Sequence, residues 1–115
     1  MEMDFSYIKS LSTSRLVEII NNVEGYEETQ EAITELKNRD VILALELGSK
    51  IITNNLGDDY LQGYVFGLMY HINPKETLKC LLLRKEAPGI VLFRDVLEEI
   101  LFDFNSYSDE VIGND

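Results

Sequence analysis

The residues that could carry chemistry are few and lie apart in the sequence. His71 is the one histidine of the chain, and its neighbours Met69, Tyr70 and Ile72 are apolar or bulky. A Ser-His-Asp device would have to use His71, yet no serine or cysteine stands in the sharp glycine-flanked turn that exposes a nucleophile. A histidine on a helix flank, bonded to a carbonyl or a carboxylate, is the simpler interpretation. We therefore predict no catalytic residue, and keep a small enzyme using His71 with a carboxylate as a third hypothesis.

Metal and phosphate sites are not indicated either. One histidine and one cysteine cannot build a zinc site without carboxylates. The adjacent Asp58 and Asp59 would point about 100° apart on a helix, so they do not converge on an ion. Gly63 and Gly67 lack the lysine and the preceding strand of a phosphate-binding loop. Because they are four residues apart, they share a helix face and would let a neighbouring helix come close. We expect neither metal nor cofactor.

The cysteine and the N-terminus bear on the compartment. Cys80, the only cysteine, lies in the apolar run 78–83, where a buried structural thiol is expected. A lone cysteine suits a reducing compartment. Residues 1–6 have neither the basic patch nor the apolar core of a signal peptide. No apolar run approaches the roughly 20 residues that span a bilayer. We expect a cytoplasmic protein.

The charge balance is strongly acidic. The 115 residues include 21 acidic and 10 basic ones, which gives a net charge of −11, and 45% are hydrophobic. Such a composition is globular, and its field repels phosphate backbones and anionic lipid. We therefore expect no nucleic-acid or membrane partner, and a basic protein as the partner that this charge attracts. The alternative is that the excess acid only maintains solubility.

Helical periodicity and helix punctuation divide the chain into seven predicted segments. They are a short one over 5–11, a second from the caps at 12–14 to residue 22, and helices over 26–38, 41–55, 59–72, 74–85 and 89–105. Residues 106–115 form a polar, acidic tail that we expect to fray. Asp40 and Asn73 are expected caps, with Pro74 at a first helical position.

These segments predict an all-α fold in one domain that spans 1–115. Helix 41–55 is apolar on most sides and should lie at the centre, whereas helix 26–38 carries only a thin apolar stripe. The pairing of a partly exposed helix with an apolar one recurs at 59–85. This pattern is typical of HEAT-like antiparallel hairpins, each packed against the next. An irregular helical bundle is the alternative.

Acidic clusters that lie close to tyrosines are the predicted partner-binding residues. Carboxylates steer a basic partner, and desolvated tyrosines hold the complex. The alternative is that each cluster is ordinary charge at a helix N-terminus and each tyrosine the edge of the core. The predicted contact residues are Glu27, Glu28, Glu31, Asp58, Asp59, Tyr60, Tyr64, Glu98, Glu99 and Asp103.

The stretch 58–72, DDYLQGYVFGLMYHI, is an acidic cap that leads into a glycine-bearing apolar helix. It resembles the helical immunity proteins of bacterial polymorphic toxin and contact-dependent growth inhibition systems. Residues 44–48 and 94–101 fit the same style, and the likeness in pattern and charge covers 26–105. It implies a cytoplasmic protein that binds a cognate toxin domain, often a basic nuclease, and blocks its active site. A toxin-neutralising immunity protein is therefore the first hypothesis. A small helical adaptor or regulatory subunit that binds another protein is the second.

Overall fold

The computed structural model describes residues 4–83, which form one 3-10 helix and five α-helices. The elements are η1 (Ser6–Ser10), α1 (Thr13–Asn22), α2 (Tyr26–Arg39), α3 (Val41–Thr53), α4 (Asp59–Ile72) and α5 (Pro74–Leu83). The described range holds no strand, and the all-α prediction is confirmed. Seven predicted helices are more than the five α-helices found. The first of the seven is the 3-10 helix η1, while the helix predicted at 89–105 and the tail 106–115 lie outside the described residues.

The helix starts are set by side-chain caps that the sequence reveals. Four side chains each accept a hydrogen bond from the backbone N–H three residues further on, at 2.9 to 3.2 Å. They belong to Ser12, Asp40, Asp58 and Asn73. Each bond satisfies one of the N–H groups that a helix start leaves without a partner. Helix α2 instead follows Gly25, whose positive φ of 77° suits a glycine, and has no side-chain cap.

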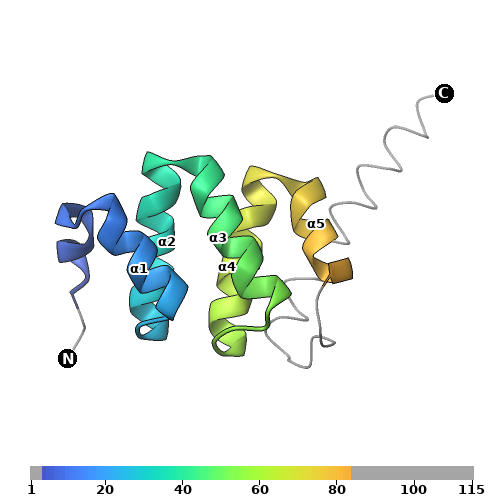
Figure 1. Ribbon diagram of the computed structural model, residues 1–115, viewed down its shortest axis with the longest axis horizontal. Coiled ribbons are helices and arrows are strands. Elements are labelled where there is room, and N and C mark those ends of the chain that lie inside the picture. Colours follow the sequence, from blue (N-terminus) through green and yellow to red (C-terminus); the bar gives the residue numbers. More distant parts are fainter. Residues whose placement is uncertain (1–3, 84–115) are drawn as a thin grey trace.

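Helices that are two apart in the chain pack side by side, so the α-helices form two layers (Figure 1). Helix α2 packs against α4, and α3 packs against α1 and α5. One layer is therefore α1, α3 and α5, and the other is α2 and α4. Consecutive helices are antiparallel, and α2 and α4 consequently run in the same direction from the lower edge of the view in Figure 1.

The core lies between these layers. Helix α3 contacts the other four α-helices, which confirms its predicted central place. The apolar side chains of its second half are buried, but Val41 and Ile42 in its first turn are exposed, Ile42 by 78%. That turn lies at the edge of the layers, where fewer neighbours cover a side chain. The largest fully buried side chains are Leu16, Ile19, Ile20, Ile33, Leu36, Ile51, Ile52, Leu61, Gln62, Phe66 and Met69. Cys80 is buried as predicted.

The close helix approach occurs at Gly48 of α3 and not at Gly67 of α4. A Cβ atom at Gly48 would lie 2.9 Å from Met69 Sδ and 3.2 Å from Val65 Cγ1, so α3 and α4 meet where no side chain fits. A Cβ at Gly67 would meet nothing within 4 Å. The prediction of close packing at Gly67 is therefore wrong. Spacing shows that residues share a face, but not that a neighbour covers that face.

Arg39, the last residue of α2, ties the N-terminal segment to the helical layers. Its guanidinium donates to the backbone oxygens of Leu11 at 2.7 Å and Lys9 at 2.9 Å. It also forms an ion pair with Glu35 at 2.9 Å. These bonds satisfy carbonyl groups that the short helix η1 leaves open at its end. One side chain therefore fixes how η1 lies against α2.

Candidate protein-binding face

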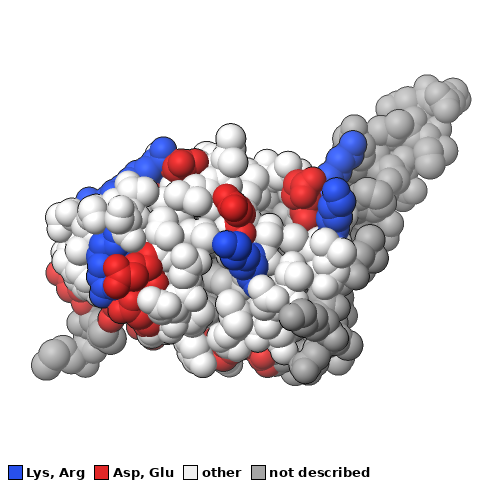
Figure 2. All heavy atoms as spheres, in the orientation of Figure 1, with Lys and Arg blue, Asp and Glu red and all other residues white. Residues whose placement is uncertain are grey.

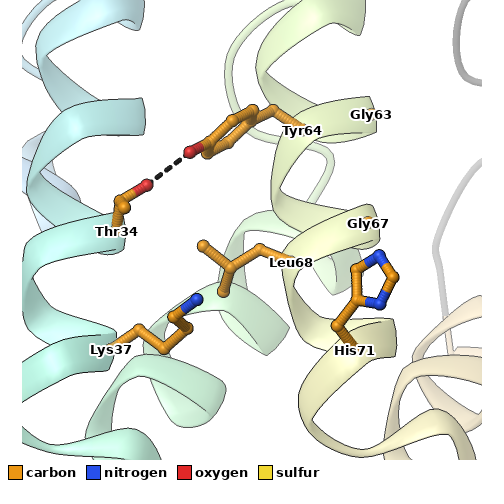
Figure 3. A pocket seen from close by; sticks show the side chains of 7 residues that line it. All are labelled: Thr34, Lys37, Gly63, Tyr64, Gly67, Leu68 and His71. Carbon is orange, nitrogen blue, oxygen red and sulfur yellow. Dashed lines mark hydrogen bonds between the residues drawn. The ribbon is translucent and has the colours of Figure 1, made fainter.

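A hydrogen bond between the hydroxyls of Tyr64 and Thr34 links α4 to α2 at the surface of their layer (Figure 3). Thr34 Oγ1 donates to the carbonyl oxygen of Gln30 at 2.8 Å, so Tyr64 is the donor in the bond between the helices. Because α2 and α4 are parallel, this bond fixes their register. Positions 30 residues apart in sequence lie beside each other along the two helices.

This register brings four of the predicted contact residues onto one exposed surface. Glu27 and Glu31 are exposed on α2, one helical turn apart. Tyr60 and Tyr64 are exposed on α4 by 65% and 41%, also one turn apart. Glu27, Glu31, Tyr60 and Tyr64 are named the acid–tyrosine face below. Two clusters that the sequence shows as separate, one on each helix, therefore form a single surface.

Other predicted contact residues have structural roles. Asp58 Oδ1 accepts the N–H of Leu61 at 2.9 Å and so caps α4. Glu28 is partly buried beside Tyr7: burial raises the pKa of the Tyr7 phenol, and the Glu28 carboxylate raises it further. Asp59, the first residue of α4, is partly exposed. The other three predicted residues, Glu98, Glu99 and Asp103, lie outside the described residues.

The carboxylates of the acid–tyrosine face, Glu27 and Glu31, form no ion pairs with basic side chains of the described residues. Glu24 is held by Arg15 through two hydrogen bonds of 2.9 and 3.0 Å, which lower the pKa of its carboxyl. Glu35 is held by Arg39. Within residues 4–83, no ion pair involves Glu27 or Glu31. The acidic cluster of 24–35 therefore divides into two paired carboxylates, Glu28 beside Tyr7, and two carboxylates that remain available.

The other layer carries a different surface. Figure 2 shows the side of the molecule that α1, α3 and α5 form. Over α3 and α5 in this view, acidic side chains lie close to basic ones, and much of the surface is uncharged. In this view the acidic side chains over α3 and α5 therefore lie next to basic ones.

A hollow of about 400 Å³ opens over α4 on the side that faces α2. In Figure 3, Lys37 extends from α2 toward Leu68, while His71 lies next to Gly67. Lys37 is half-buried, and its ammonium has neither an ion pair nor a hydrogen bond in the part of the chain that the structure describes. The hollow is lined by Thr34, Lys37, Gly63, Tyr64, Gly67, Leu68 and His71, and is named the Lys37 hollow below.

Within residues 4–83, His71 makes no hydrogen bond, in contrast to the hydrogen-bonded histidine expected from the sequence. It is exposed and approaches Tyr70 edge to face, with ring centroids 6.3 Å apart. The described lining of the Lys37 hollow contains no carboxylate. The hollow thus does not hold the pair of groups, His71 with a carboxylate, that the enzyme hypothesis needs. Sequence reasoning missed Thr34 and Lys37, because an isolated threonine and lysine on a polar helix carry no signal of their own.

Comparison with known proteins adds no assignment. A scan of protein-family models and searches of curated proteins and of solved structures found no match to this chain. Among residues 4–83, no helix has both the length and the hydropathy that crossing a bilayer requires. The same residues contain no cluster of three or more histidine, cysteine, aspartate or glutamate side chains placed to hold a metal ion.

Proposed function

We propose that this protein is an immunity protein that binds a cognate bacterial toxin domain and neutralises it, with the acid–tyrosine face as its contact. The helices would form a HEAT-like stack in which the parallel pair α2 and α4 presents one continuous surface. The observation that carries the proposal is the Tyr64–Thr34 bond. This bond joins unpaired carboxylates and exposed tyrosines into one face.

The chemistry of this face suits a basic protein partner. Glu27 and Glu31 have no cation to compete for them among the described residues, so they are free to steer a positively charged surface. Tyr60 presents most of its ring to solvent, and a partner that covers it gains apolar contact and a hydrogen bond to its hydroxyl. The chain's net charge of −11 supports the same class of partner.

Co-expression tests the proposal. Cells that produce the toxin encoded beside this gene should survive when the protein is present and die without it. Survival should be lost with the double variant Glu27→Lys/Glu31→Lys and with Tyr60→Ala. The matched control is Glu46→Lys/Glu76→Lys, which makes the same charge change at exposed positions of α3 and α5. Death with the unaltered protein would refute immunity, and equal loss with the control would refute this face as the contact.

The adaptor function is a second candidate, favoured by one observation. Val41 and Ile42 stand exposed beside each other at the start of α3, by 45% and 78%. Apolar side chains in such a position suit a site that another subunit covers. Self-association in sedimentation velocity that is lost with Ile42→Gln, together with failure of the co-expression rescue, would favour the adaptor over the immunity protein.

A further inference from the structure

We propose that the Lys37 hollow binds one carboxylate of the partner protein. In the partner, this carboxylate would lie next to an apolar side chain that enters the hollow with it. This inference rests on the proposed function, since the partner in question is the one that docks on the acid–tyrosine face. It adds a second, oppositely charged site to that face and gives the docked segment a direction.

The first argument is the state of Lys37. Lys9, Lys50 and Lys75 also lack ion pairs within residues 4–83, but all three are exposed and solvated. Lys37 alone in this group is half-buried, and its ammonium has no charge partner among the described residues. A carboxylate within reach of the ammonium would supply that charge and a charge-assisted hydrogen bond. Among the described lining residues, the ionisable groups besides Lys37 are Tyr64 and His71, and none is a carboxylate that would compete for the ammonium.

The second argument is the shape of the hollow around Gly67. A Cβ there would meet nothing within 4 Å, so packing inside the described fold does not require a glycine. Glycine in a helix interior is less stable than alanine, and it is suited to places where another group approaches the backbone closely. Beside Gly67, the apolar surface of Leu68 and the Tyr64 ring offers contact to a side chain. The hollow is open to solvent, and its volume of about 400 Å³ is enough to receive one side chain of a partner.

The third argument is the charge order along α2. Glu27 and Glu31 lie toward its N-terminal end, whereas Lys37 lies toward its C-terminal end. Ten residues of helix separate Glu27 from Lys37 by about 15 Å. A segment docked on α2 and α4 would therefore place basic groups at Glu27 and Glu31 and its carboxylate at Lys37. The reversed orientation would bring like charges together.

The test uses the full chain and two small probes. N-acetyl-L-phenylalanine carries an apolar side chain next to a carboxylate, and its primary amide is the uncharged match. In ¹H–¹⁵N spectra we expect the acid to shift the amide signals of Lys37, Gly67 and Leu68 with a millimolar dissociation constant. The amide should bind about fivefold more weakly, the size expected for one partly exposed ion pair. Lys37→Gln should abolish this difference, while the control Lys50→Gln should preserve it.

Three results would overturn the inference. They are equal binding of acid and amide, no shift up to about 20 mM acid, and shifts that map away from the hollow. None of these results affects the co-expression rescue, so this inference and the proposed function can fail separately.

Discussion

Tyr64 of α4 donates a hydrogen bond to Thr34 of α2, across 30 positions of sequence. The bond lies at the surface of the layer and joins two parallel helices whose exposed faces carry complementary features. The carboxylates of Glu27 and Glu31 lie on α2, and the rings of Tyr60 and Tyr64 lie on α4. The candidate surface therefore depends on a tertiary contact and does not belong to either helix alone.

The first prediction concerns that contact. Tyr64→Phe keeps the ring but removes the hydroxyl, so Thr34 keeps its bond to the Gln30 carbonyl and loses the bond between the helices. Because the bond is exposed, we expect a loss of only about 0.5 to 1 kcal/mol in the free energy of unfolding. Urea denaturation measures it. Tyr60→Phe is the control, since no described interaction uses the Tyr60 hydroxyl, and it should change stability by less than about 0.5 kcal/mol. Equal effects at both positions would show that the bond does not link the helices.

The second prediction compares two glycines in helix interiors. Gly67→Ala should raise the free energy of unfolding by about 0.5 to 1 kcal/mol, because the new methyl group meets open space and the helix gains propensity. Gly48→Ala should lower it by about 1 kcal/mol, because the methyl group would crowd Met69 and Val65. Thermal and urea unfolding give both values. Similar changes of the same sign would contradict the described packing of α3 on α4.

The third prediction concerns Arg39. Arg39→Lys keeps the charge, but one ammonium cannot reach Glu35 and the carbonyl oxygens of Lys9 and Leu11 together. We expect a loss of about 1.5 to 3 kcal/mol in the free energy of unfolding, the range for hydrogen bonds to a charged group. Hydrogen exchange should show the amide of Leu11, at the end of η1, opening faster. Arg15→Lys, which removes contacts within α1 and its following turn, should leave that amide unchanged.

The fourth prediction concerns pH. Hydrogen bonds from Arg15 hold the pKa of Glu24 below its ordinary value. A carboxyl with a lowered folded-state pKa contributes stability above its unfolded pKa of about 4.3, and that stability is lost as the pH falls through the folded pKa. Between pH 5 and pH 3, about the window of this titration, the melting temperature of Glu24→Gln should fall less than that of the unaltered protein. An equal fall in both proteins would contradict the pair.

Local features of the fold were predictable from the sequence, and long-range ones were not. Ser12, Asp40, Asp58 and Asn73 cap helices as expected, because a cap acts on a backbone N–H only three residues away. Periodicity likewise identified the central place of α3. Both signals are contained within one helix.

Three features that the sequence did not predict involve partners far apart in the chain. Arg39 binds carbonyl groups 28 and 30 residues earlier, and Tyr64 binds Thr34 at a separation of 30. Gly67 was expected to pack closely, but the close approach belongs to Gly48. Each outcome depends on which helices become neighbours and in what register, which no single helical pattern encodes. For the same reason, the sequence could not predict the Lys37 hollow, or that the acidic cluster of α2 and the tyrosines of α4 lie on one surface.

The most direct test of the central claim is the rate at which this protein associates with its proposed partner, the toxin domain that the co-expression rescue identifies, measured by stopped-flow. With Glu27→Lys/Glu31→Lys, we predict association slower by about tenfold or more at low salt, because electrostatic steering is reversed. The control Glu46→Lys/Glu76→Lys should associate at close to the unaltered rate. Equal rates for the unaltered protein and the Glu27/Glu31 variant, or an equal slowing by both variants, would contradict the acid–tyrosine face as the binding surface.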